Sequence, residues 1–323
     1  MIGELDVIVP SLPVDDALLL GGLFVVERAK GVRPNFSLSD NPATVAAVIE
    51  ICRRLDGLPL GIELAAARMA GMSVVDVRDR LDHRFRLLAG TAEAPRRQQS
   101  LPELVRWSSA LLDVAEREVL RRSAAFAGGF TLASFCGVFE VGDDTVVLRA
   151  LDRLVRSSLV VAEHTDGRVR YRLLETIRQF GVDELIAADL LQTCRDQHAR
   201  WFAGAVVARW ETHNGPGWAQ AVDWVRTELA DLRAAVRWAG ERGELAIASD
   251  IAAHAALIGT SGNLFEPIMW AENLADEAIS AGIPRLPRLL CACGYACFAG
   301  RAAAAADRAE HAVRLEGEPG YDS

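Results

Sequence analysis

Apolar residues recur at helical spacing in the first part of the chain. Between residues 42 and 55 they fall at positions 45, 48, 49, 52 and 55, on one face of a helix. Gly57-Leu58-Pro59-Leu60 ends this helix, and an Ala- and Leu-rich helix continues to about Met69. A short helix is expected at 74–81. Because only residues 7–9 have the pattern of a strand, and a helix is expected at 13–29, this block is predicted to be mainly α.

The pattern changes after a polar connector at residues 91–97. Helices are expected at about 101–112, 115–125 and 144–157, with a short helix near 131–138. Two apolar runs, 159–161 and 169–171, then flank Thr165-Asp166-Gly167, and an Asp-Gly turn between such runs is typical of a β-hairpin. Three helices followed by a hairpin form the plan of a winged helix.

The chain is predicted to be helical throughout from Leu174 onward. Helices of about 12 to 20 residues alternate with glycine-containing turns at 215–217, 240–243, 259–262, 281–284 and 299–300. The pair 289–299 and 301–315 has small residues at the spacing that lets paired helices approach closely, as in tetratricopeptide repeats. A plain α-helical bundle is the alternative.

Composition narrows the class of protein. The 323 residues are 51% hydrophobic and 24% charged, which is globular, and the net charge is -9. Nucleic-acid binding needs a positive field, so an acidic chain argues against DNA contact over its whole surface, although a local basic stripe is allowed. No apolar run can span a bilayer, no signal peptide is visible, and the six cysteines suit a reducing compartment. We therefore expect a cytoplasmic protein without membrane contact.

A long string at residues 51–68, ICRRLDGLPLGIELAAAR, resembles the GLPL segment of bacterial NB-ARC nucleotide-binding regulators, which are STAND-type ATPases. Residues 97–101, 126–130, 171–178 and 228–238 are similar to later parts of the same family, in the same order, so the resemblance covers almost the whole chain. It implies the end of a nucleotide-binding domain plus a helical lid domain at 1–95, a winged helix at 96–188 and tetratricopeptide-like helical repeats at 189–323. The expected fold is therefore mainly α with one small β-hairpin.

The resemblance also implies a switch controlled by ADP and ATP, in which the helical repeats receive the signal or hold the protein shut, and opening often leads to oligomers. Gly57, Leu58, Pro59 and Leu60 match the family's nucleotide-contacting turn, where the proline packs on adenine. A helix-breaking turn between packed helices is the alternative interpretation. The family's Met-His-Asp triplet is replaced here by Leu173, Leu174 and Glu175, which puts phosphate sensing in doubt because leucine cannot donate a hydrogen bond.

The chemistry of ATP hydrolysis is missing from this sequence. The only lysine, Lys30, is followed by Gly31-Val32 and does not lie in a phosphate-binding loop, and no strand ends in paired acids. The histidines are scattered, and neither a metal-ligand pattern nor a catalytic nucleophile motif occurs. We expect no catalysis by this chain and no metal. ADP or ATP would belong to the intact family protein, with none bound by this segment.

Arg149, Arg153 and Arg156 fall on one face of the helix that would read DNA in a winged helix. However, residues 98–178 carry eleven arginines and eleven acidic residues, whereas DNA-binding modules are usually basic. The sequence therefore favours a signalling segment that acts through domain packing and protein partners, the nucleotide domain included, with DNA contact disfavoured. The alternative is a transcriptional regulator that binds DNA through the winged helix; family relatives in actinobacteria are often fused to a LuxR-type DNA-binding domain.

Overall fold

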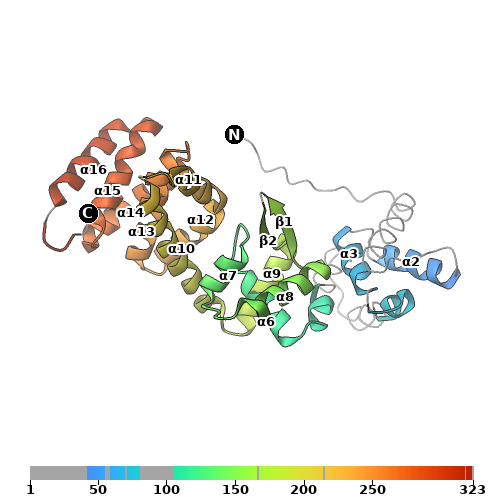
Figure 1. Cartoon of the computed structure of the whole chain (residues 1–323). Coiled ribbons are helices and arrows are strands. Elements are labelled where there is room, and N and C mark those ends of the chain that lie inside the picture. Colours follow the sequence, from blue (N-terminus) through green and yellow to red (C-terminus); the bar gives the residue numbers. More distant parts are fainter. Residues whose placement is uncertain are drawn as a thin grey trace, which may run out of the picture. The chain divides into compact units, whose positions relative to one another are not determined.

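The computed structural model describes residues 42–54, 59–69, 71–80, 105–165, 167–213, 215–316 and 318–321. The chain divides into two compact units. Figure 1 labels their helices and strands in sequence colours. The first contains the described residues up to Arg121 together with 145–164 and 173–181; the second contains 122–144, 165–172 and the described residues from Val182 on. The strand and helix expected before residue 30 lie outside the described residues.

The first unit is helical at its start, as expected. Helix α2 spans Pro42–Arg54 and α3 spans Pro59–Arg68, and residues 74–80 and 105–110 are also helical. The two labelled helices pack together, and the side chains of Ile51, Ile62 and Leu64 are fully buried. These residues repeat at helical spacing, so burial of one apolar face explains why the helices form.

Two reciprocal capping interactions mark helix starts in this unit. The Ser73 hydroxyl accepts a hydrogen bond from the Asp76 amide (3.1 Å), and the Asp76 carboxylate accepts one from the Ser73 amide (3.2 Å). Asp113 and Glu116 make the same exchange at the start of α6, Val114–Ser123 (2.8 and 3.1 Å). Each pair satisfies amide groups that a helix N-terminus leaves without intrahelical partners.

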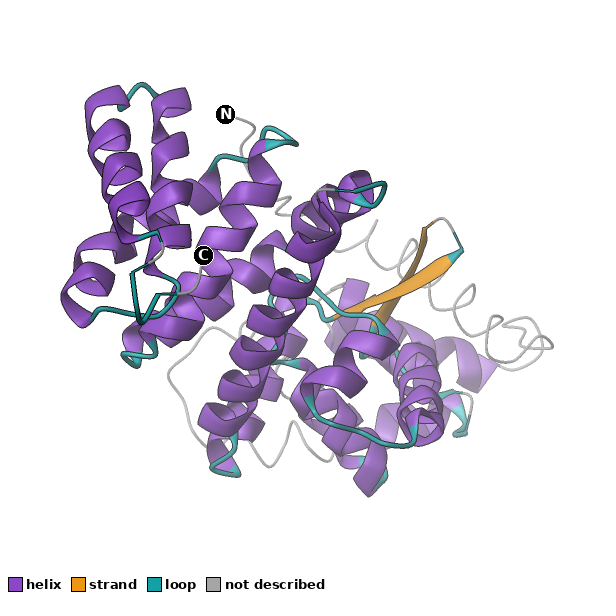
Figure 2. Ribbon diagram, turned by 60° about the vertical axis from the view of Figure 1, so that its left-hand side comes forward, coloured by secondary structure: helices purple, strands orange, loops and turns teal. Residues whose placement is uncertain are grey.

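The winged-helix plan is confirmed. Helix α6 is followed by α7 (Leu132–Val138), α8 (Asp144–Arg156), strand β1 (Val161–Thr165) and strand β2 (Arg168–Arg172), and α9 (Glu175–Ala187) comes next. The two strands form the only sheet among the described residues, visible as the orange hairpin in Figure 2. The turn between them contains Gly167, whose φ of 73° suits glycine.

The predicted start of the hairpin was wrong by two residues. Leu159 and Val160 were expected in the first strand, but they close the end of α8 instead. Ser158 adopts a left-handed conformation (φ 56°), and the amide of Leu159 bonds to the carbonyl of Leu154 at 3.0 Å. This wrap satisfies a terminal carbonyl of the helix, and it delays the strand until Val161.

Besides α7 and the end of α9, the second unit contains seven α-helices among the described residues. They are α10 (Leu191–His213), α11 (Trp218–Thr227), α12 (Leu229–Glu241), α13 (Leu245–Thr260), α14 (Glu266–Ala281), α15 (Leu286–Gly294) and α16 (Ala302–Leu315), with a 3-10 turn at Tyr295–Ala299. Helix α13 packs against α10, α12, α14 and α15, and most of its residues are buried. It is rich in alanine and apolar around most of its circumference, as a central helix must be. The relation to tetratricopeptide repeats stays a prediction.

The described helices include none with the length and apolar character needed to cross a membrane.

Candidate functional site

Helix α8 presents a charged face to solvent. Val147, Ala150, Leu151 and Leu154 are buried on its inner face. Arg149, Arg153 and Arg156 are exposed, as their spacing at i, i+4 and i+7 predicts. The three candidate DNA-contacting side chains therefore share one accessible surface of the second helix of the helix-turn-helix, which is the position of a recognition helix.

The three arginines differ in their partners. Arg153 Nε lies 3.2 Å from Glu116 Oε1, and Arg156 pairs with Asp152 at 2.8 Å. Arg149 makes no ion pair within the described part of the chain. The Arg156 pair is more than half exposed on both sides, so it contributes only about 0–1 kcal/mol and can exchange its carboxylate for a phosphate. Val146 and Leu148 are also partly exposed here, so the surface is mixed in character.

Glu116 fixes the position of Arg153. Its side chain is largely buried, and one oxygen caps the start of α6 while the other accepts from Arg153. The charges of Arg153 and Glu116 also act on Arg68 of α3. The Arg68 guanidinium donates hydrogen bonds to the carbonyl of Ser108, at 3.0 Å, and to the Ser108 hydroxyl. Burial, together with the positive charge of Arg153, lowers the pKa of Arg68 to about 10.

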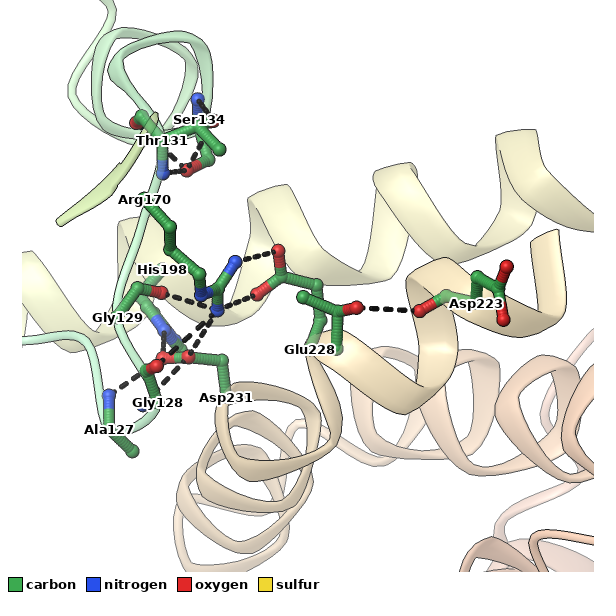
Figure 3. Close-up of polar contacts among 11 residues, drawn as sticks. Ala127, Gly128, Gly129, Thr131, Ser134, Arg170, His198, Asp223, Glu228 and Asp231 are labelled. Carbon is green, nitrogen blue, oxygen red and sulfur yellow. Dashed lines mark hydrogen bonds and ion pairs between the residues drawn. The ribbon is translucent and has the colours of Figure 1, made fainter. Parts of the chain in front are cut away.

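A buried polar network occupies the second unit (Figure 3). Its centre is Asp231 in the first turn of α12, whose side chain is fully buried. The carboxylate accepts hydrogen bonds from the amides of Ala127 (2.7 Å) and Gly128 (2.9 Å). His198 of α10 lies 2.9 Å away through Nε2 and must donate, because a carboxylate only accepts. Asp231 thus joins α12, α10 and the turn before α7.

Arg170 of β2 belongs to the same network. Its two terminal nitrogens bind both oxygens of Glu228 at 2.6 and 2.7 Å, and one of them donates to the Gly129 carbonyl at 2.8 Å. Glu228 is the N-cap residue of α12. Burial raises the pKa of Glu228 above its ordinary value, while the Arg170 guanidinium opposes the rise. This bidentate pair fastens the second strand of the hairpin to α12.

Two glycines allow the chain to approach this closely. A side chain on Gly129, where φ is 98°, would come within 2.6 Å of the Tyr171 carbonyl, and one on Gly128 would press on Asp231 at 3.0 Å. Directly after them, Phe130 and Tyr171 exchange both backbone hydrogen bonds, at 2.8 and 2.7 Å. No local pattern in the sequence indicates the carboxylate that lies against this Gly-Gly pair.

The assignment of Gly57, Leu58, Pro59 and Leu60 to adenine contact stays a prediction. Gly57 and Leu58 lie outside the described residues. Pro59 and Leu60 were assigned to the turn, but they are the first two residues of α3; their side chains are outside the described set. Glu175 lies in the first turn of α9 and binds Arg178 at 2.7 and 2.8 Å, which lowers the pKa of its carboxyl. In the described ranges, no group of three or more His, Cys, Asp or Glu residues could hold a metal.

Comparison with known proteins supports the winged helix. Residues 112–186 match the family model of a winged helix-turn-helix domain. The chain is 39% identical over 284 residues to "Putative HTH-type transcriptional regulator Rv0890c" of Mycobacterium tuberculosis, covering 86% of this chain and 31% of that protein; its counterpart in Mycobacterium bovis matches equally. An uncharacterised protein of Mycobacterium tuberculosis is 45% identical over 188 residues, covering 57% of this chain and 46% of its own length. The chain thus spans about a third of the length of the regulators it matches.

Proposed function

We propose that this chain is a segment of a transcriptional regulator that contacts DNA through α8 of its winged helix. The observation that carries the proposal is the exposed arginine face of α8 within the segment that matches a winged helix-turn-helix. The names of the relatives, which describe HTH-type transcriptional regulators, add support. The neutral charge of this segment favoured a packing role, whereas the family match and the names of the relatives favour DNA contact.

The structure limits how strong such contact can be. Arg149 has no ion-pair partner among the described residues, Arg156 has an exposed and weak one, and Arg153 is held by the largely buried Glu116. Each arginine that neutralises a phosphate contributes about -0.9 to the slope of log affinity against log salt concentration. Three contacts would give a slope of roughly -2.7, and two would give roughly -1.8. We therefore expect modest, salt-sensitive binding.

A gel-retardation assay with genomic DNA fragments at two salt concentrations tests the proposal. The chain should retard a subset of fragments at low salt, and Arg149→Ala should weaken this by about ten- to a hundredfold, because a charge-assisted hydrogen bond is worth about 1.5–3 kcal/mol. The matched control is Arg314→Ala, which removes an exposed arginine near the end of α16. Equal loss in both variants would mean that only overall charge matters, and no retardation by the unaltered chain would reject the proposal.

A second function is a docking segment of a nucleotide-controlled switch, as the NB-ARC resemblance implies. The observation that favours it is that carboxylates of the chain already pair with Arg153 and Arg170, which leaves fewer arginines for phosphate. It predicts no retardation of DNA by the chain, and specific association with a separately produced nucleotide-binding domain. It also predicts no phosphate release from ATP by this chain alone; turnover above background would contradict the expectation drawn from the missing phosphate loop.

A further inference from the structure

In strand β2, three arginines alternate along the sequence with Val169 and Tyr171. Arg168, Arg170 and Arg172 are spaced by two, so they share one face of the strand, while Tyr171 is buried on the other. A two-stranded ribbon with arginines on one face is a shape that can lie against DNA, and arginines are the common partners of phosphate. Arg168 and Arg172 are exposed.

Arg170, unlike Arg168 and Arg172, is largely buried. Only 19% of its side chain is exposed, and its guanidinium is held in a bidentate pair by Glu228, whose side chain is 7% exposed. A second carboxylate, that of Asp231, lies 4.0 Å from Arg170. Two oxygens on one side of a planar guanidinium reproduce the way a phosphate binds arginine. Glu228 therefore occupies the surface of Arg170 that a phosphate would need.

Both carboxylates come from the start of α12. Glu228 is the N-cap and Asp231 lies in the first turn, where the partial positive charge of the helix N-terminus stabilises them. The other ends of the contacts lie on β2 and on the turn 127–129. Any change that moved the start of α12 away from these segments would break both contacts together and expose Arg170.

We propose that Arg170 can bind a DNA phosphate and that Glu228 and Asp231 block it in the closed state, so that the C-terminal helices regulate DNA binding by the hairpin. This inference rests on the proposed function. The closed state is the one that the structure shows. A partner or ligand that displaced the start of α12 would release Arg170, adding one phosphate-binding cation on the hairpin and making the salt dependence steeper by about 0.9.

The test is a double-mutant cycle with the full chain, using labelled duplexes recovered from the genomic retardation assay. Glu228→Gln should bind about tenfold more tightly at low salt, with a slope steeper by about 0.9. Arg170→Gln should bind like the unaltered chain because its arginine is already occupied. The double variant should lose the whole gain, since the gain acts through Arg170. Glu241→Gln, at the exposed end of α12, removes the same charge elsewhere and should have no such effect.

A second measurement does not depend on DNA. Phenylglyoxal modification, followed by mass spectrometry, should label Arg170 slowly in the unaltered chain and at least severalfold faster in Glu228→Gln. If Glu228→Gln fails to fold, as judged by circular dichroism, Glu228→Asp keeps the charge but shortens the reach and should show part of both gains.

The outcomes separate the two claims. Absence of DNA binding in every variant would reject the proposed function and the DNA role of Arg170 with it. DNA binding that loses strength with Arg149→Ala but does not change with Glu228→Gln would overturn this inference alone. Equal gains from Glu228→Gln and Glu241→Gln would also overturn it, because they would show general electrostatics, as would labelling of Arg170 that Glu228→Gln does not accelerate.

Discussion

Replacing Asp231 with alanine should destabilise the second unit strongly. The carboxylate accepts three hydrogen bonds, from the amides of Ala127 and Gly128 and from His198, and it is fully buried. Truncation leaves those three donors without their partner in a place that water does not reach. Each unsatisfied buried donor costs about 1–3 kcal/mol.

The net loss is smaller than the sum of these costs. Removing the carboxylate also ends the cost of keeping a charge buried, and it relieves the repulsion that contributes to the raised pKa of Glu228. Breaking a buried polar arrangement by removing one partner typically costs about 3–5 kcal/mol. We therefore expect Asp231→Ala to lower the free energy of unfolding by about 4 kcal/mol, which at a typical urea dependence shifts the midpoint by roughly 2 M.

Tryptophan fluorescence during urea unfolding measures this change. Six of the seven tryptophans, at positions 201, 210, 218, 224, 238 and 270, lie in the second unit, so the signal reports on it. The control is Asp223→Ala on α11, which removes a carboxylate that is 73% exposed and paired with Arg226. Such a pair is worth about 0–1 kcal/mol. If Asp231→Ala costs less than about 1 kcal/mol, or no more than Asp223→Ala, the buried network does not stabilise this unit.

Two further predictions concern the same unit. Gly137→Ala should destabilise the protein by about 1–3 kcal/mol, because a methyl group there would overlap the indole of Trp201. Gly204→Ala should stabilise it by about 0.5–1 kcal/mol, because Gly204 faces open space in the middle of α10. The melting temperatures of the two variants should therefore move in opposite directions. Burial, assisted by the charge of Arg288, lowers the pKa of His254, so the unfolded chain takes up the proton more readily. The free energy of unfolding should therefore fall as pH decreases through the ordinary histidine pKa of about 6.5, and His254→Gln should flatten that dependence in urea titrations at pH 8 and pH 5.5.

Local rules predicted the elements well where one physical cause dominates. The spacing of Arg149, Arg153 and Arg156 placed them on one exposed face because helix geometry alone fixes that result. The Asp-Gly turn located the hairpin, since few sequences suit the required backbone. The strand start failed at Leu159-Val160, because the same apolar pair can extend a strand or cover a helix end. The left-handed conformation of Ser158 makes the pair cover the helix end, and a serine in the sequence does not predict that conformation.

The polar network could not be predicted from local pattern. Glu228 and Asp231 drew notice only through a family resemblance, and neither Arg170 nor His198 stood out. Their partners lie 33 to 104 residues away in the sequence, so no periodicity connects them. What the sequence does contain is an acidic pair at i and i+3 at the start of an amphipathic helix. That pattern is also common on solvated helix ends, so burial is the information that only the fold supplies.

Charge counting is the clearest case in which placement matters more than composition. Residues 98–178 are neutral overall, which argued against DNA contact. A net charge, however, gives exposed and buried ion pairs the same weight. Arg156 and Asp152 are both more than half exposed and can separate at little cost, whereas Arg170 and Glu228 are 19% and 7% exposed and separate only if α12 moves. The first pair therefore leaves an arginine available to a phosphate, and the second withholds one. Under the proposed regulation, the same formal charge would therefore bind DNA weakly while the Arg170–Glu228 pair is closed and more strongly once that pair is broken.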